Sequence, residues 1–233
     1  MRGIKGMIFD MDGTMVDNMM VHHRAWQAAL REEGIDWPLE RVQQEVHGVN
    51  EEILLRLFGE KFTAADRKRV SGGKEAAYRR IYAPELKAVD GVIEFIDRAA
   101  ALHVPLAIAT AAPAENADFL LDALALRDRF TAIVNAGHVS NGKPHPEVVN
   151  RAAAGLGLEA ADCLFFEDSP TGAGAGQNAG SHVLILTTTH EPTEFAGYTT
   201  VRSFLKDFSG LEIRPLEEDG RFGVWDGMGV RLV

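Results

Sequence analysis

The chain has 233 residues and a formal net charge of −10, with 46% hydrophobic and 25% charged residues. This length allows one or two domains with a buried core, and the composition is that of a globular protein. The negative charge argues against a non-specific nucleic-acid-binding protein, which needs a basic face. It is compatible with an anionic small substrate, because one bound divalent cation reverses the local field.

The single cysteine and the short apolar runs bear on the cellular compartment. Cys163 cannot form an intramolecular disulfide, and its apolar neighbours indicate a small buried residue rather than a catalytic thiol. The sequence has no apolar stretch close to the ~20 residues that a membrane-spanning helix needs. Asp10 also interrupts the first apolar run too early for a secretory signal. We therefore expect a cytoplasmic protein with neither a membrane nor a nucleic-acid partner.

The first predicted element is a strand at residues 6–10. Its letters, GMIFD, form a short apolar run that ends in Asp10, and Asp12, Gly13 and Thr14 follow closely. A strand that is apolar on both faces is typical of a parallel sheet covered by helices. Two carboxylates this close repel each other, so their position directly after a buried strand needs a chemical reason.

The next part of the chain contains helical patterns only. These patterns follow one another with no strand between them, at residues 18–34, 50–59 and 63–82. We predict that residues 17–85 form a small helical domain inserted after the first strand. Residues 1–16 and 86–233 would then form an α/β core.

From residue 91 onward, apolar runs alternate with helical patterns. The predicted strands are 104–110, 131–136, 163–168 and 182–188, and the predicted helices are 91–103, 114–126, 145–158 and 169–180. This alternation predicts an α/β fold with a Rossmann-like open parallel sheet and right-handed crossovers. In the tail, residues 220–233 predict two short strands around a turn at Asp226-Gly227.

Polar side chains with useful chemistry follow four of the predicted strands. In chain order they are Asp10 with Asp12, Thr110, Lys143, and Glu167 with Asp168. Because ligands bind beyond the carboxyl ends of the strands in an open α/β sheet, we expect these side chains to meet there. Asp10 and Asp168 would share a Mg²⁺ ion, which prefers oxygen ligands. Thr110 and Lys143 would hold the oxygens of a phosphoryl group.

The two aspartates after the first strand suit phosphoryl transfer. Asp10 would be the nucleophile and form an aspartyl-phosphate. Asp12 would be the general acid and base, which protonates the leaving oxygen and later deprotonates water. An aspartate with its ordinary pKa of ~3.9 is protonated in about one molecule in a thousand at neutral pH, so this role needs a site that excludes water. The predicted helical domain would exclude water by closing over the site.

Each of these signals also has an ordinary structural interpretation. Two acids in a loop are often just solvated, a threonine often ends a strand, and a lysine usually lies on the surface. Glu167 and Asp168 can cap the following helix. The combination is more specific than its parts, because all four signals occur at strand ends.

Four segments together resemble the motifs of the haloacid dehalogenase-like superfamily. FDMDGTMVD (9–17) resembles the first motif, D-x-D-G-T, and IAT (108–110) resembles the second, a strand that ends in Thr or Ser. GKPHPE (142–147) resembles the Lys-Pro motif, and FFEDSPTGAGAGQNAG (165–180) resembles the fourth, Glu-Asp-Ser motif. The resemblance spans residues 4 to about 188, and the helical insertion corresponds to the type-1 cap. The chain is similar to the β-phosphoglucomutase-like phosphatases in particular.

This resemblance implies a role for each residue of the set. Asp10 would be the nucleophile and would ligate Mg²⁺ together with Asp168 and the backbone carbonyl of Asp12. Glu167 would be a further ligand or would support the ligands. The phosphate-binding residues would be Thr110, Ala111 and Lys143. The cap residues expected at the substrate are His22, Gly48, Asn50 and Glu51, with His47 and Lys74 as further candidates.

The function implied by the resemblance is a Mg²⁺-dependent phosphatase of a small phosphorylated metabolite, such as a sugar phosphate, acting as a monomer. The alternative is a hexose phosphate mutase of the β-phosphoglucomutase type. Such a mutase holds a second phosphate with a cap arginine, and Glu51 stands at the matching position in HGVNEEI (47–53). A carboxylate there repels a phosphate, which favours hydrolysis. A non-catalytic binder with the same fold is a third possibility, which the intact motif residues disfavour.

Overall fold

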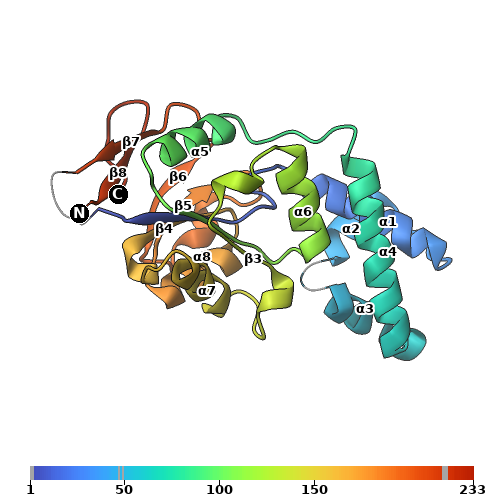
Figure 1. The fold of residues 1–233 in the computed structure, drawn as a ribbon. Coiled ribbons are helices and arrows are strands. Elements are labelled where there is room, and N and C mark those ends of the chain that lie inside the picture. Colours follow the sequence, from blue (N-terminus) through green and yellow to red (C-terminus); the bar gives the residue numbers. More distant parts are fainter. Residues whose placement is uncertain (1–2, 47, 49, 217–219) are drawn as a thin grey trace. The chain divides into compact units, whose positions relative to one another are not determined.

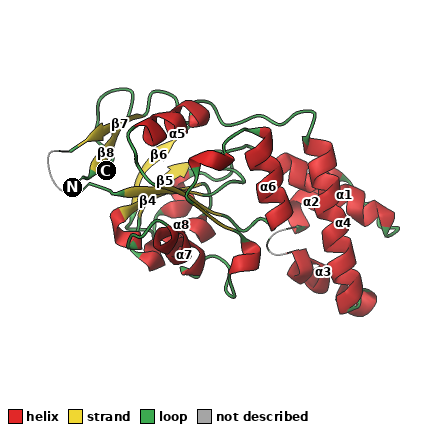
Figure 2. Ribbon diagram, in the orientation of Figure 1, coloured by secondary structure: helices red, strands yellow, loops and turns green. Residues whose placement is uncertain are grey.

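The computed structural model describes residues 3–46, 48, 50–216 and 220–233 (Figure 1). The chain divides into two compact units. The core unit comprises Met1–Asp17 and Lys87–Val233, and the helical unit comprises Asn18–Leu86. All the described strands belong to the core unit, whereas the described elements of the other unit are helices (Figure 2).

A six-stranded sheet organises the core unit. Its strand order is β3-β2-β1-β4-β5-β6, and all neighbouring pairs are parallel. The strands are β1 (Gly6–Phe9), β2 (Leu106–Ala109), β3 (Ala132–Val134), β4 (Cys163–Glu167), β5 (His182–Leu186) and β6 (Val201–Leu205). The predicted α/β class with a parallel sheet is confirmed. β6 lies outside the predicted strands because it is an edge strand with alternating exposure, so it lacks a continuous apolar run.

Helices bury both faces of the central strands. The helices of this unit are α5 (Val92–Ala101), α6 (Ala114–Ala123), α7 (Glu147–Gly155) and α8 (Pro170–Ala179), with the 3₁₀ turns η2 (Arg127–Arg129), η3 (Ala136–His138), η4 (Ala160–Asp162) and η5 (Pro192–Phe195). Ile8 and Phe165 pack with residues of α7 in one apolar cluster. Their neighbours Phe9 and Phe166 stack 4.7 Å apart and contact Phe95 of α5. Successive strand residues point to opposite faces, so this two-sided burial explains the uninterrupted apolar letters of β1 and β4.

The tail of the core unit differs from the prediction. β7 (Glu212–Pro215) and β8 (Phe222–Trp225) form an antiparallel pair, so the partner of β8 precedes it in the chain. The turn at Asp226-Gly227 exists, because the Asp226 carboxylate accepts hydrogen bonds from the backbone N–H groups of Met228 and Val230 at 2.9 and 2.8 Å. Beyond this turn the described chain makes one isolated bridge, Trp225 to Arg231, in place of the predicted second strand.

The helical unit consists of α1 (Met19–Glu32), α2 (Leu39–Glu45), α3 (Asn50–Phe58), η1 (Gly59–Lys61) and α4 (Ala64–Tyr82). α4 is one continuous helix through Gly72-Gly73, and it begins with a capping box between Thr63 and Asp66. α2 lies outside the predicted helices, because its seven residues are too few for a clear helical period. Among the described helices of the chain, the structure has none that is both long and apolar enough to cross a membrane.

Candidate active site

The carboxyl ends of β1 and β4 bring the predicted acids together. The two strands pair directly, with Phe9 opposite Phe166, so Asp10 comes to lie beside Glu167. The backbone N–H of Asp10 donates to the carbonyl of Phe166 at 2.9 Å, which fixes this register beyond the strand end. One carboxylate oxygen from each of Asp10, Glu167 and Asp168 lies within 4.8 Å of the others, and all three side chains are buried. We call these three residues the acidic cluster.

Lys143 binds two members of the acidic cluster. Its Nζ lies 2.6 Å from Oδ1 of Asp10 and 2.7 Å from Oε1 of Glu167, and its side chain is only 8% exposed. Burial by itself would lower the pKa of Lys143, but the charges of Asp10 and Glu167 outweigh burial and raise it. The lysine therefore stays protonated. It comes from the loop that precedes α7.

The second carboxylate oxygen of Glu167 is also engaged. Its Oε2 accepts the backbone N–H groups of Asp168 and Ser169, both at 2.7 Å, and the Ser169 hydroxyl at 3.0 Å. Burial alone would raise the pKa of Glu167, but Lys143 and these hydrogen bonds outweigh it and lower the pKa. A Cβ on Gly172 would lie 1.7 Å from Oε1 of this carboxylate. The glycine of the Glu-Asp-Ser motif is therefore required by the position of the Glu167 side chain.

The acidic cluster carries more negative charge than Lys143 can balance. Burial, followed by the charges of Glu167 and Asp12, raises the pKa of Asp10 to about 7 despite the nearby lysine. Burial and the charges of Glu167 and Asp10 likewise raise the pKa of Asp168. Buried carboxylate oxygens that repel one another are the donor set that a hard divalent cation takes. The residues present therefore fit a metal ion such as Mg²⁺.

A tight turn after β1 brings the first motif against Asp168. The backbone N–H of Gly13 donates to the carbonyl of Val16 at 2.8 Å, and Gly13 adopts a φ of +81°, which favours glycine. A Cβ at this position would also lie 2.2 Å from Oδ2 of Asp168. The side chain of Asp12 is half-buried, and its charge contributes to the raised pKa of Asp10.

Thr110 ends β2 at the same edge of the sheet. β2 is the other neighbour of β1, with Ile108 opposite Phe9. The buried Thr110 hydroxyl accepts the backbone N–H of Ala112 at 3.0 Å, and Ala111 between them is exposed. The predicted phosphate-binding segment is thus a short turn at the carboxyl edge, next to the strand that carries Asp10.

Several polar residues at this edge lie outside the predicted set. Thr14 donates to Oδ1 of Asp168 in a long contact of 3.4 Å. Thr188 donates to the carbonyl of Gly13, and Thr189 donates to Oδ2 of Asp168. The sequence signal that could have pointed to Thr188 and Thr189 is their position in the polar segment after the apolar run of β5.

The predicted recognition residues belong to the helical unit. The His22 ring on α1 stacks on Tyr78 with centroids 4.2 Å apart, and its Nδ1 lies 2.9 Å from Nζ of Lys74. The buried Lys74 also pairs with Glu75 at 2.8 Å, and Asn50 donates to the same carboxylate at 2.6 Å. We call His22, Asn50, Lys74, Glu75 and Tyr78 the helical-unit cluster.

Two other predicted recognition residues, Gly48 and Glu51, do not join the helical-unit cluster by any described contact. Gly48 and Glu51 are exposed, and Gly48 has a φ of +101°. Glu51 lies in the first turn of α3, where a carboxylate is favourable at the positive end of the helix dipole. His47 lies outside the described residues.

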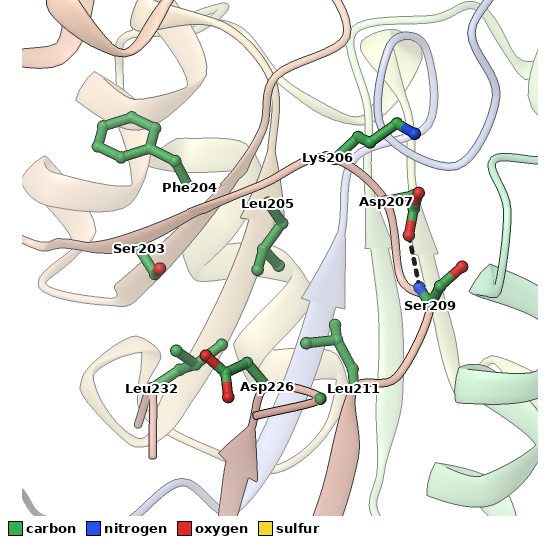
Figure 3. A pocket seen from close by; sticks show the side chains of 10 residues that line it. Ser203, Phe204, Leu205, Lys206, Asp207, Ser209, Leu211, Asp226 and Leu232 are labelled. Carbon is green, nitrogen blue, oxygen red and sulfur yellow. Dashed lines mark hydrogen bonds between the residues drawn. The ribbon is translucent and has the colours of Figure 1, made fainter. Parts of the chain in front are cut away.

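A cavity of about 280 Å³ lies in another part of the core unit (Figure 3). It is lined by residues of β6, of the segment that follows it and of the tail, namely Ser203, Phe204, Leu205, Lys206, Asp207, Ser209, Leu211, Asp226, Gly227 and Leu232. None of the predicted site residues belongs to this lining. We therefore assign the candidate active site to the acidic cluster rather than to this cavity.

The comparison with known families agrees with the motifs. The family described as haloacid dehalogenase-like hydrolase matches residues 4–180. The chain belongs to the haloacid dehalogenase-like hydrolases. Named relatives of this chain include a CbbY protein from Cupriavidus necator, 34% identical over 88% of this chain and 87% of its own length. A β-phosphoglucomutase from Bacillus subtilis is 30% identical over 76% of this chain and 80% of its own length.

Two further comparisons concern activity class and fold. A fructose-1-phosphate phosphatase from Escherichia coli is 28% identical over 75% of this chain and 92% of its own length. These comparisons confirm the predicted enzyme class, a phosphoric monoester hydrolase of the haloacid dehalogenase-like family. A crystal structure of CbbY from Rhodobacter sphaeroides with xylulose 1,5-bisphosphate has a TM-score of 0.78, 22% identity, and coverage of 88% of this chain and 95% of its own. This likeness supports the fold.

Proposed function

We propose that this protein is a Mg²⁺-dependent phosphatase that hydrolyses a small phosphorylated metabolite, such as a sugar phosphate, through an aspartyl-phosphate. The observation that carries the proposal is the buried acidic cluster, Asp10, Glu167 and Asp168, held together by Lys143 at the carboxyl edge of the sheet. A relative named as a fructose-1-phosphate phosphatase supports the same class of reaction.

The metal ligands would be Asp10, Asp168 and the backbone carbonyl of Asp12, with Glu167 supporting them. When bound, the ion would polarise the phosphoryl group and offset the charge that develops in the transition state. Glu167 suits the supporting role, because both of its oxygens are already engaged by Lys143, Ser169 and the backbone N–H of Asp168.

The remaining steps fall to residues of this chain. The Asp10 carboxylate would attack phosphorus, and the bond to the leaving oxygen would break as Asp12 donates its proton. Asp12 would then take a proton from the water that hydrolyses the aspartyl-phosphate. Lys143, which already binds Asp10, would also bind a phosphoryl oxygen, and Thr110 and Ala111 would bind the others through hydroxyl and backbone N–H groups.

The helical unit would act as the cap that selects the substrate, with residues 17–85 as the inserted domain. Lys74 is a buried cation of this unit, and Glu75 already balances its charge at 2.8 Å. Such a pair suits the hydroxyl groups of an uncharged leaving group better than a second phosphate. Together with Glu51 at the position of the mutase arginine, this favours hydrolysis over the mutase reaction.

The proposed partner is one small phosphorylated metabolite. The formal net charge of −10 argues against a nucleic-acid partner, which needs a basic face. We place the enzyme in the cytoplasm and expect it to be a monomer. Size-exclusion chromatography with light scattering checks the oligomeric state directly.

The test is phosphate release from a panel of phosphorylated sugars and polyols, measured with Mg²⁺ and with EDTA. We expect turnover with Mg²⁺, none with EDTA, and none for Asp10→Asn under either condition. An Asp10→Asn variant that is as fast as the wild type would overturn the proposal.

The mutase alternative has its own arm in the same experiment. β-Glucose 1-phosphate is incubated with the enzyme, Mg²⁺ and a hexose bisphosphate primer. Free phosphate and glucose are expected if the enzyme is a phosphatase. Conversion to glucose 6-phosphate without phosphate release would establish the mutase instead.

A further inference from the structure

The segment that follows β5 contacts both acidic loops of the core unit. It reads Thr187-Thr188-Thr189-His190 and leaves the sheet at the same carboxyl edge as Asp10 and Asp168. Thr188 donates to the carbonyl of Gly13 in the first motif, and Thr189 donates to the Asp168 carboxylate in the fourth. One short segment therefore ties the two motifs together.

Thr189 contacts Asp168 twice and has a partner behind it. Its hydroxyl lies against Oδ2 of Asp168 and 3.2 Å from the backbone carbonyl of the same residue. Nδ1 of His190 lies 2.8 Å from the same Thr189 hydroxyl. The His190 ring is held in turn by an edge contact with Phe195, at 6.3 Å between centroids. The order Asp168, Thr189, His190, Phe195 is a continuous chain of contacts.

We propose that Thr189, backed by His190, is a positioning residue that holds the Asp168 carboxylate in its metal-binding orientation. The inference rests on the proposed function, in which Asp168 is a ligand of the divalent cation. Hydrogen bonds from neighbouring residues fix the orientation and basicity of metal-binding carboxylates, and their loss typically weakens metal affinity 10–100-fold.

The number of protons available on each group decides which group donates and which accepts in this chain of contacts. A threonine hydroxyl has one proton, and the carboxylate of Asp168 in its metal-binding state is ionised and can only accept, so Thr189 donates its proton to Asp168. The Thr189 oxygen must then accept from His190, which places a proton on Nδ1 of that ring. Both donors point toward the carboxylate, and consecutive hydrogen bonds of this kind strengthen each other. His190 thereby makes Thr189 a better donor to Asp168.

Thr187 provides a matched control within the same segment. Its hydroxyl donates to the backbone carbonyl of Leu205 at 3.3 Å, toward β6. A Thr→Val change there removes a hydroxyl of the same kind from the same segment. Its described contacts do not include Asp168, so it should leave metal binding unchanged.

The experiment is calorimetric titration of the full chain with Mg²⁺ alone, for the wild type, Thr189→Val, Thr189→Ser and Thr187→Val. We expect Thr189→Val to weaken Mg²⁺ binding about 10–100-fold, while Thr189→Ser and Thr187→Val stay within about threefold of the wild type. Melting curves of the metal-free proteins show whether each variant is folded at the titration temperature.

A second pair of variants tests the role of His190 without touching Thr189. His190→Ala removes the donor to the Thr189 oxygen, and we expect Mg²⁺ binding to weaken, by less than in Thr189→Val. His190→Asn offers an amide N–H near the position of Nδ1 and should restore most of the affinity. This pair keeps the proposal testable if Thr189→Val does not fold.

The outcomes separate this inference from the proposed function. No Mg²⁺ binding by the folded wild type would remove the metal assignment and this inference with it. Wild-type binding with Thr189→Val equal to the wild type would overturn the positioning role alone. Equal weakening in Thr189→Ser and Thr189→Val would also overturn it, because the hydroxyl would then not be the cause.

Discussion

Lys143 and Lys74 both have buried side chains, but they lie in clusters that differ in charge balance. In the core unit, Lys143 faces the carboxylates of Asp10 and Glu167, with Asp168 close by, so negative charge is in excess. In the helical unit, Lys74 pairs with Glu75 and also contacts Nδ1 of His22. The first arrangement calls for an added cation, whereas the second is already balanced. This difference agrees with the proposed function, which assigns the reaction to the core unit and the choice of leaving group to the helical unit.

The largest expected effect separates the two clusters by their kinetics. Asp12→Asn in the core unit should lower kcat by ~10²–10⁴-fold, the usual contribution of a general acid and base. His22→Ala in the helical unit should mainly raise KM, because the role proposed for His22 is a contact to the leaving group rather than a proton transfer. Steady-state kinetics on the best panel substrate measure both. If Asp12→Asn mainly raised KM and His22→Ala mainly lowered kcat, the roles proposed for the two clusters would be contradicted.

The next expected effect concerns stability and its rescue by metal. Lys143→Met leaves buried carboxylates without their cation, and removing one partner of a buried ion pair typically costs 3–5 kcal/mol of unfolding free energy. Lys74→Met should also destabilise the protein, through Glu75. Urea unfolding with and without Mg²⁺ distinguishes them, because Mg²⁺ should restore much of the loss in Lys143→Met and none in Lys74→Met. Equal rescue of both variants would contradict the difference in charge balance.

The pH dependence of stability should reveal the excess charge in the core unit. The pKa of Asp10 rises from its ordinary 3.8 to about 7 on folding. Below pH ~4 it is protonated in both states, and as pH rises toward ~7 the unfolded state ionises first, so its contribution to stability is lost across this window. The raised pKa of Asp168 likewise lowers stability as pH rises, whereas the lowered pKa of Glu167 increases stability as pH rises.

Comparing the unfolding of the wild type and of Asp10→Asn in EDTA isolates the contribution of Asp10 to the pH dependence of stability. The stability of the wild type relative to the variant should fall between pH ~4 and ~7 and level off above it. Saturating Mg²⁺ should flatten this fall. A relative stability that rises with pH in EDTA would contradict the excess of negative charge in the acidic cluster.

The smallest expected effect uses two helical glycines. Gly172→Ala would put a Cβ 1.7 Å from the Glu167 carboxylate, so the side chain must shift, and we expect a loss of about 1–3 kcal/mol in stability. Gly73→Ala in α4 meets no atom within 4 Å and should stabilise the protein by up to ~1 kcal/mol through helix propensity. Thermal and urea unfolding measure both changes. Equal changes in stability of the same sign would show that the contact with Glu167 is not the reason for a glycine at position 172.

The sequence was most informative where local pattern and topology coincide. Asp10, Thr110 and Asp168 could be placed at one edge because each follows an apolar strand, and a parallel sheet brings such ends together. Lys143 could be assigned to the same edge, but not its contacts to Asp10 and Glu167. The roles assigned to these residues stay predictions that the experiments above address.

Other features depend on contacts that no local pattern encodes. His22 and Lys74 are 52 positions apart and meet only because α1 packs on α4. Thr188 and Thr189 carry no charge and resemble the end of an ordinary strand, so their contacts to Gly13 and Asp168 required the structure. β6 and the partner of β8 were missed because exposed edge strands lack the uninterrupted apolar run of buried ones.

The central claim is that Asp10 receives a phosphoryl group with a divalent cation at the acidic cluster. Beryllium fluoride mimics a phosphoryl group bound to an aspartate carboxylate, and ¹⁹F NMR detects it on the intact protein. With Mg²⁺ present, the account predicts protein-bound fluoride resonances for the wild type, which disappear with EDTA and in Asp10→Asn. Bound resonances that persist in Asp10→Asn, or none in the wild type at saturating Mg²⁺, would contradict it.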